Sequence, residues 1–176
     1  MAIKTMAASS GGGDSKWTQG WHTLKIKTAE YSDWNGKRFI ECTFDGYPAN
    51  FTLRIYEAHN KETHEEFAIA KLFKLANAGI IDTVKSPSGK EAIQYDDDAI
   101  QLEGKRINVF FYKNAEGYNR ISDRIAPVAQ KGEILSYSDD DVSYWKAAAE
   151  KHYAERLLKA DAPATNPTTN AEEIPF

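Results

Sequence analysis

The stretch that decides the fold is KRFIECTF at residues 37–44, in which polar and apolar positions alternate. Ile40, Cys42 and Phe44 share one face, and Lys37, Phe39, Glu41 and Thr43 share the other. A period of two is typical of a strand that buries one face. We therefore predict a half-buried strand here, with Cys42 as a core residue rather than a nucleophile.

Four other segments of the chain repeat this alternation. They are Trp21–Thr28, Phe51–Tyr56, Arg106–Tyr112 and Tyr118–Ile125. Their predicted inner faces carry Leu24, Ile26, Phe51, Leu53, Ile55, Ile107, Val109, Phe111, Ile121 and Ile125. Asp123 also falls on the inner face of the last segment, where the pattern does not account for a carboxylate.

Two helices are expected outside these strands. Thr63 followed by Glu66 reads as a capping box that opens a helix over Thr63–Ala78, and Gly79 suits its end. A second helix is predicted over about Asp139–Lys159, because three aspartates begin it and basic residues gather later. The segment Thr83–Glu103, with turn residues at 86–89, fits either a long loop or a hairpin.

The order of three strands, a helix and two strands is that of the five-stranded OB barrel. We therefore predict a mainly β protein, with an OB-fold domain at 17–137, although the same pattern also permits a small α+β sandwich. Residues 1–16 and 161–176 have small, polar or proline-rich compositions and are expected to be disordered. The C-terminal helix, 138–160, would link the domain to a flexible acidic tail.

Composition limits the class of protein. The chain has 176 residues, one cysteine and a net charge of −4. It contains no apolar run long enough for a membrane span and no secretory signal, so a soluble, cytoplasmic protein is expected. The excess of acids lies in residues 138–176, which hold eight acids and four bases, and the charges of residues 1–137 sum to zero.

The outward positions of the predicted strands combine cations with aromatic rings. Single-stranded nucleic acid needs both, because cations neutralise phosphates and rings stack on bases. The alternative reading is that the rings pair across strands or pack beneath a helix. The candidate DNA-binding residues, including the turn at 31–38, are Trp21, Lys25, Lys27, Trp34, Lys37, Arg38, Arg54, Tyr56, Arg106, Phe110, Tyr112, Tyr118, Arg120 and Arg124.

No catalytic arrangement is evident, so we do not expect an enzyme, a cofactor or a bound metal. The four histidines do not have metal-ligand spacing, and Ser88-Gly89-Lys90 lacks the rest of a phosphate loop. Asp96-Asp97-Asp98 could hold Mg²⁺, as in a nuclease, but adjacent aspartates on a strand point to opposite faces.

The chain ends in Ala171-Glu172-Glu173-Ile174-Pro175-Phe176. This end resembles the C-terminal tip of bacterial and phage single-stranded DNA-binding proteins, where acids precede a terminal Ile-Pro-Phe. The resemblance implies that Glu172, Glu173, Ile174, Pro175 and Phe176 bind replication, recombination and repair proteins. The short acidic stretch and the long C-terminal helix depart from the compact bacterial type, so oligomeric state does not carry over.

Together these features predict a protein that coats and protects single-stranded DNA without sequence specificity in replication or recombination. If phage-encoded, it would act in the host cytoplasm, and it could form a homo-oligomer. The alternative is an OB-fold adaptor of the replication machinery that binds a polypeptide and has no strong affinity for DNA. A metal-dependent nuclease using residues 96–98 is a third reading.

Overall fold

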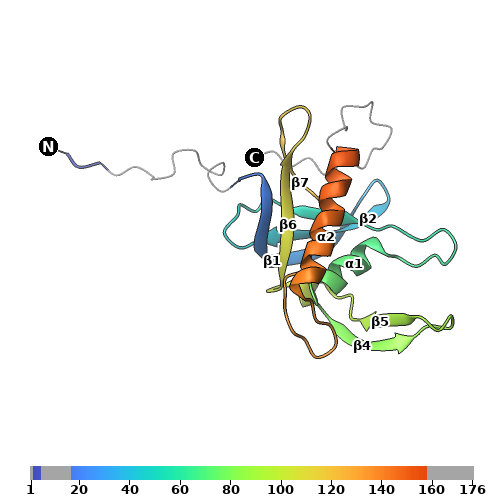
Figure 1. Cartoon of the computed structure of the whole chain (residues 1–176). Helices are drawn as coiled ribbons and strands as arrows, with labels where there is room; N and C mark the ends of the chain where they lie inside the picture. The colour runs from blue at the N-terminus through green and yellow to red at the C-terminus, as the bar shows by residue number, and fades with distance from the viewer. Residues whose placement is uncertain (1, 5–16, 158–176) are drawn as a thin grey trace.

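The computed structural model describes residues 2–4 and 17–157, and most of its regular structure is antiparallel sheet (Figure 1). The predicted tail at 161–176 and most of the predicted N-terminal segment lie outside the described residues. The mainly β class with a C-terminal helix is confirmed.

Five strands form the main sheet, in the order β3-β2-β1-β6-β7. Their bounds are β1 Gly20–Trp34, β2 Lys37–Phe44, β3 Leu53–Tyr56, β6 Arg106–Lys113 and β7 Asn119–Ile121. All five predicted strands are therefore present. Among the described residues no pairing joins the edge strands β3 and β7, so the closure that an OB barrel requires is not confirmed.

Strand β1 holds the sheet together because it pairs with a different neighbour along each half. Residues 20–25 pair with β6, and residues 26–34 pair with β2. The register shifts between Ile26 and Thr28, so Lys27 occupies a bulge, which bends a strand and increases its twist. The sequence pattern ended this strand at Thr28 and treated 31–38 as a loop. The structure continues it to Trp34, leaving only Asn35 and Gly36 in the turn, both at positive φ as a tight hairpin requires.

Strand β7 is shorter than predicted, and this explains why the alternation assigned the Asp123 carboxylate to the inner face. The strand ends at Ile121, and the Ser122 hydroxyl then accepts a hydrogen bond from the Arg124 backbone N–H at 3.0 Å. Asp123 therefore lies on a turn, where its carboxylate is 3.8 Å from the Arg124 guanidinium, and not on the inner face. Ile125 returns to the core immediately afterwards.

The segment between helix α1 (Ala68–Leu75) and β6 is a hairpin, one of the two predicted possibilities. Strands β4 (Ile80–Lys85) and β5 (Glu91–Tyr95) form a separate two-stranded sheet beside the main one (Figure 1). Gly79 precedes it at φ +65°, and a Cβ there would lie 2.5 Å from the backbone oxygen of Asp96. A 3₁₀ turn, η2 (Ala99–Leu102), then leads to β6.

Helix α1 spans Ala68–Leu75 and begins five residues later than predicted. The Thr63–Glu66 capping box does not form, because the Glu66 carboxylate instead accepts bonds from the backbone N–H groups of Ala68, Ile69 and Ala70, each at 2.9 Å. It therefore satisfies the free donors of the first helical turn itself.

Helix α2 spans Asp139–His152 and continues as one π-helical turn, η3 (Tyr153–Leu157). Its start agrees with the sequence, and its cap is a reciprocal pair between Ser138 and Asp141. The predicted last residues of the helix, 158 and 159, lie outside the described residues.

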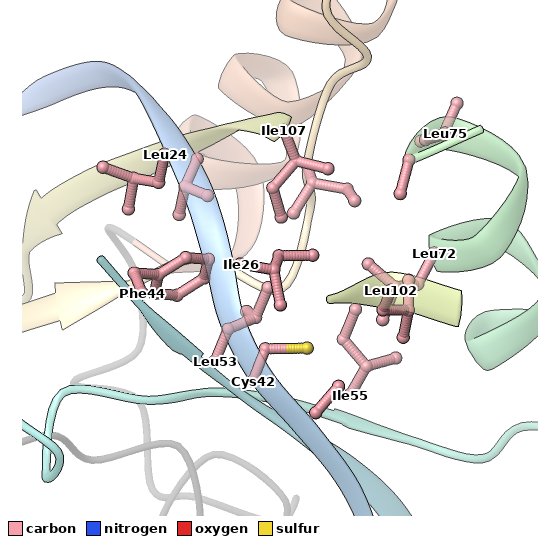
Figure 2. Close-up of a cluster of buried hydrophobic side chains, with 14 of the residues drawn as sticks. Leu24, Ile26, Cys42, Phe44, Leu53, Ile55, Leu72, Leu75, Leu102 and Ile107 are labelled. Carbon is pink, nitrogen blue, oxygen red and sulfur yellow. The ribbon is translucent and has the colours of Figure 1, made fainter. Parts of the chain in front are cut away.

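The core lies between the main sheet and α1. Side chains from β1, β2, β3, β6, α1 and η2 converge there, and Figure 2 shows Ile26, Cys42, Ile55, Leu72 and Leu102 among them. The expected burial of Cys42 is confirmed, and burial raises the pKa of its thiol to about 12. A thiol with so high a pKa carries almost no thiolate at neutral pH, so it is a poor nucleophile.

Candidate nucleic-acid interface

Three of the predicted stacking rings lie beneath the C-terminal helix. Trp21, Phe110 and Tyr112 pack with Tyr153 and Leu157 of η3, and α2 lies beside β6 in Figure 1. The ring centroids of Phe110 and Tyr112 each lie 5.4 Å from that of Tyr153, and the two side chains are 7% and 4% exposed. The predicted exposure of Phe110 and Tyr112 is therefore wrong, and Trp21 is partly buried. The alternative prediction, that these rings pack beneath a helix, is confirmed for this part of the sheet.

Two further predicted side chains are buried rather than outward-facing. Tyr56, on β3, is 8% exposed, and Arg120, on β7, is 6% exposed. The Arg120 guanidinium lies 5.2 Å from the ring centroid of Tyr118, which is itself 57% exposed at the end of the β6–β7 hairpin. Only the Tyr118 part of this pair offers an open ring.

The face of β2 and β3 that points away from the core carries two cation–ring pairs. The Lys37 ammonium lies 5.7 Å from the ring centroid of Tyr56, and the Arg54 guanidinium lies 4.8 Å from that of Phe39. The two rings are 5.0 Å apart. Arg54 also donates to the carboxylate of Glu41, so part of its charge is already neutralised. We call this set of five residues the β2–β3 face.

The β1–β2 turn extends the β2–β3 face toward solvent. Trp34 is 46% exposed and lies directly opposite Lys37 in the strand ladder. The Arg38 guanidinium stacks 3.9 Å from the ring centroid of Tyr31, whose hydroxyl donates to the Asp97 carbonyl. Burial and the Asp97 charge raise the pKa of Tyr31 to about 12, so this phenol stays protonated and keeps its donor role.

A second group of predicted cations lies elsewhere on the sheet. Lys25 stands opposite Arg106 in the β1–β6 ladder, and Lys27 is in the adjacent bulge. Lys25 also approaches Asp45 at 3.9 Å. Seven residues separate Lys27 from Trp34, which is roughly 23 Å along an extended strand. The structure therefore divides the predicted surface into two groups instead of one continuous face.

A cavity of about 520 Å³ opens beside the β2–β3 face, between β3, α1, residues 123–125 and α2. Of the predicted residues it brings together Lys37, Tyr56 and Arg124, and it adds Lys71, Lys151 and Arg156, which sequence analysis missed. Those three cations lie on helices, and the alternation of polar and apolar residues indicates only the outward positions of strands. The signal that could have found Lys151 and Arg156 was the accumulation of bases in the second half of the predicted C-terminal helix, whereas no such signal marks Lys71.

The acidic group at 96–98 is used locally. Asp98 accepts from the Ile100 backbone N–H at the start of η2, and Asp96 accepts from the Asp98 N–H and from the Gln101 amide. Within residues 2–4 and 17–157, no group of three or more His, Cys, Asp or Glu side chains is arranged to hold a metal ion. The predicted partner-binding residues, Glu172 to Phe176, lie outside the described residues.

The chain matches no family model, no curated protein and no solved structure. None of the helices in the described part of the chain is long and apolar enough to cross a membrane.

Proposed function

We propose that this protein binds single-stranded DNA without sequence specificity, coats it during replication or recombination, and recruits partner proteins through its C-terminal tip. The observation that carries the proposal is the β2–β3 face, where Lys37 and Arg54 lie against Tyr56 and Phe39 next to an exposed Trp34. Such a surface offers phosphates its cations and offers a base the exposed ring of Trp34, while Phe39 and Tyr56 are buried and support Arg54 and Lys37 from below.

An OB-type scaffold belongs to the same proposal. The strand order β3-β2-β1-β6-β7, with a long bent β1 and a helix after β3, is the order that an OB barrel uses before its edges meet. Pairing between β3 and β7 would complete it. The DNA-facing surface of such a barrel includes its second and third strands, which correspond here to β2 and β3.

The position of α2 narrows the proposed surface. The C-terminal helix covers Phe110 and Tyr112 on β6. The bound single-stranded DNA would therefore run over β2, β3 and the β1–β2 turn, and not over β6. Trp34, Lys37, Arg38 and Arg54 are then the contacts we assign to DNA. The rings beneath α2 serve the fold.

A binding titration tests the proposal. Fluorescence anisotropy of a labelled oligo-dT is measured with the wild type, with the double variant Lys37→Ala, Arg38→Ala, and with a control, Lys85→Ala, Lys90→Ala. The control removes the same charge from the β4–β5 hairpin. We expect the first variant to bind at least tenfold more weakly and the control to bind within about twofold of the wild type. A wild type that does not bind oligo-dT would favour the adaptor function.

A further inference from the structure

The cavity beside α2 has walls from four parts of the chain that are distant in sequence. Tyr56 comes from β3, Lys71 from α1, Arg124 from the turn after β7, and His152 from the end of α2. Its volume of about 520 Å³ falls within the range of sites that hold a small ligand, roughly 300–1,000 Å³. Trp145 adds an aromatic wall, and the Lys71 ammonium lies 5.4 Å from the centroid of its ring.

Two residues of the cavity walls each carry a buried polar atom that has no hydrogen-bond partner of normal geometry within the described residues, the Tyr56 hydroxyl and His152 Nδ1. The nearby Arg54 guanidinium interacts with the Tyr56 hydroxyl. Burial lowers the pKa of Arg54, but Glu41 and this hydroxyl together raise it above its ordinary value. Tyr56 is more than nine-tenths buried, so water cannot freely supply the missing bond. Buried polar atoms are rarely left unsatisfied in folded proteins, and such an atom is explained when a ligand supplies its bond.

The cavity also has an excess of positive charge. Its walls carry five cationic side chains, Lys37, Lys71, Lys151, Arg124 and Arg156, against three carboxylates, Glu57, Asp123 and Glu155. Burial lowers the pKa of Lys71, and the neighbouring Arg124 lowers it further. Burial also lowers the pKa of His152, with Arg124 and Arg156 adding to the effect against Asp123 and Glu155. The positive charges of neighbouring arginines thus disfavour the protonated forms of Lys71 and His152, and a bound anion would offset those charges.

We propose that this cavity holds one nucleotide of the bound single strand, with its phosphate between Arg124 and Lys71 and its base against the aromatic walls. The Tyr56 hydroxyl would donate to the phosphate, and so would His152 Nδ1 when it carries a proton. Lys37 belongs both to this cavity and to the β2–β3 face, which makes the two sites continuous. The inference rests on the proposed function, and it adds that the bound single strand is anchored by one nucleotide in this cavity.

The first test separates the hydroxyl from the ring. Tyr56→Phe removes only the hydroxyl oxygen, and Lys71→Gln removes one cation while keeping an aliphatic stem. Binding of labelled oligo-dT should weaken about fivefold to tenfold in each, whereas Lys90→Ala on the β4–β5 hairpin should leave it unchanged. Thermal unfolding of each variant shows that the fold is retained. If Tyr56→Phe and Lys71→Gln are folded and bind as tightly as the wild type, the nucleotide does not enter the cavity.

The second test follows His152 by NMR, with thymidine 5′-monophosphate and inorganic phosphate beside oligo-dT. We expect oligo-dT to raise the pKa of His152, because a phosphate opposes the field of Arg124 and Arg156. A rise with inorganic phosphate but not with oligo-dT would overturn the inference in favour of a free-anion site. Failure of the wild type to bind oligo-dT at all would refute the proposed function itself. Normal binding with an unchanged His152 pKa would refute only the cavity.

Discussion

Trp21 and Phe110 are direct partners in the β1–β6 ladder, and their ring centroids lie 5.1 Å apart beneath α2. The Lys146 ammonium of α2 lies 5.5 Å from the centroid of the Trp21 ring. This packing fixes the C-terminal helix on the sheet. The rings therefore contribute to stability, and under the proposed function we do not expect them to stack on bases.

The first prediction follows from that packing. Replacing Phe110 by Ala removes a buried ring from the contact between β6 and α2, so the free energy of unfolding should fall by roughly 3 kcal/mol. Urea unfolding measures the loss. Affinity for oligo-dT, measured below the unfolding transition, should change less than threefold. A folded variant with unchanged stability and a large loss of affinity would return Phe110 to the DNA-binding surface.

The second prediction concerns the start of α1. The Glu66 carboxylate accepts from three backbone N–H groups of the first turn and from that of Ala58 at 3.0 Å. Glu66→Ala should lower the free energy of unfolding by about 2 kcal/mol, since hydrogen bonds to a charged group are among the stronger ones. Glu66→Gln keeps one acceptor oxygen and should lose less.

A matched change at Glu65 controls for the loss of charge. Glu65 is exposed and precedes α1 by three residues, so Glu65→Ala should change stability by less than about 0.5 kcal/mol. Equal losses in the Glu65 and Glu66 variants, measured by chemical denaturation, would show that the carboxylate does not cap the helix.

The third prediction concerns pH. Burial, followed by the charge of Arg124, lowers the pKa of His152 below its ordinary 6.5 in the folded protein. The unfolded chain therefore takes up this proton at a higher pH, and stability falls as the solution is acidified from 6.5 toward the folded pKa. His152→Gln should flatten this part of the stability curve. Unfolding curves from about pH 7.5 to about pH 5 test it, and parallel curves for the two proteins would contradict it.

The fourth prediction separates the tip from the domain. Deletion of Ala171–Phe176 removes two glutamates and the terminal ring but no described element, so affinity for oligo-dT should stay the same or rise at low salt. Capture of a replication protein should be lost, and Phe176→Ala alone should lose most of it, because a buried ring usually dominates such contacts. A truncation that abolishes DNA binding but spares partner capture would reverse the two roles.

The strands and the core could be predicted because alternation directly reports which side chains a sheet buries. Ile40, Cys42 and Phe44 are fully buried, as the pattern required. Alternation shows only that the second face of a strand points away from the core. It does not show whether that face is exposed to solvent or covered by a helix, as α2 covers Phe110 and Tyr112. The predicted start of α1 was wrong for a local reason. The Thr63–Glu66 spacing fits a capping box that opens a helix at Thr63, but it fits equally well a helix that starts after Glu66 and is capped by the Glu66 carboxylate alone.

The candidate site was predicted only in part. Lys37, Tyr56 and Arg124 were selected one by one from separate strands, and the structure places all three around one cavity. Lys71 and His152 complete it from two helices. Contacts of this kind depend on how helices pack on a sheet, which the period of a single segment does not record.

Salt dependence tests the central claim most directly. The dissociation constant for oligo-dT is measured at several sodium chloride concentrations, with a duplex of the same length beside it. If about four of the five assigned cations, Lys37, Arg38, Arg54, Lys71 and Arg124, meet phosphates, log K against log salt should slope near −3, at roughly −0.7 per phosphate of a single strand. The duplex should bind much more weakly, because its bases are already stacked. A flat salt dependence, or equal affinity for duplex and single strand, would contradict the account.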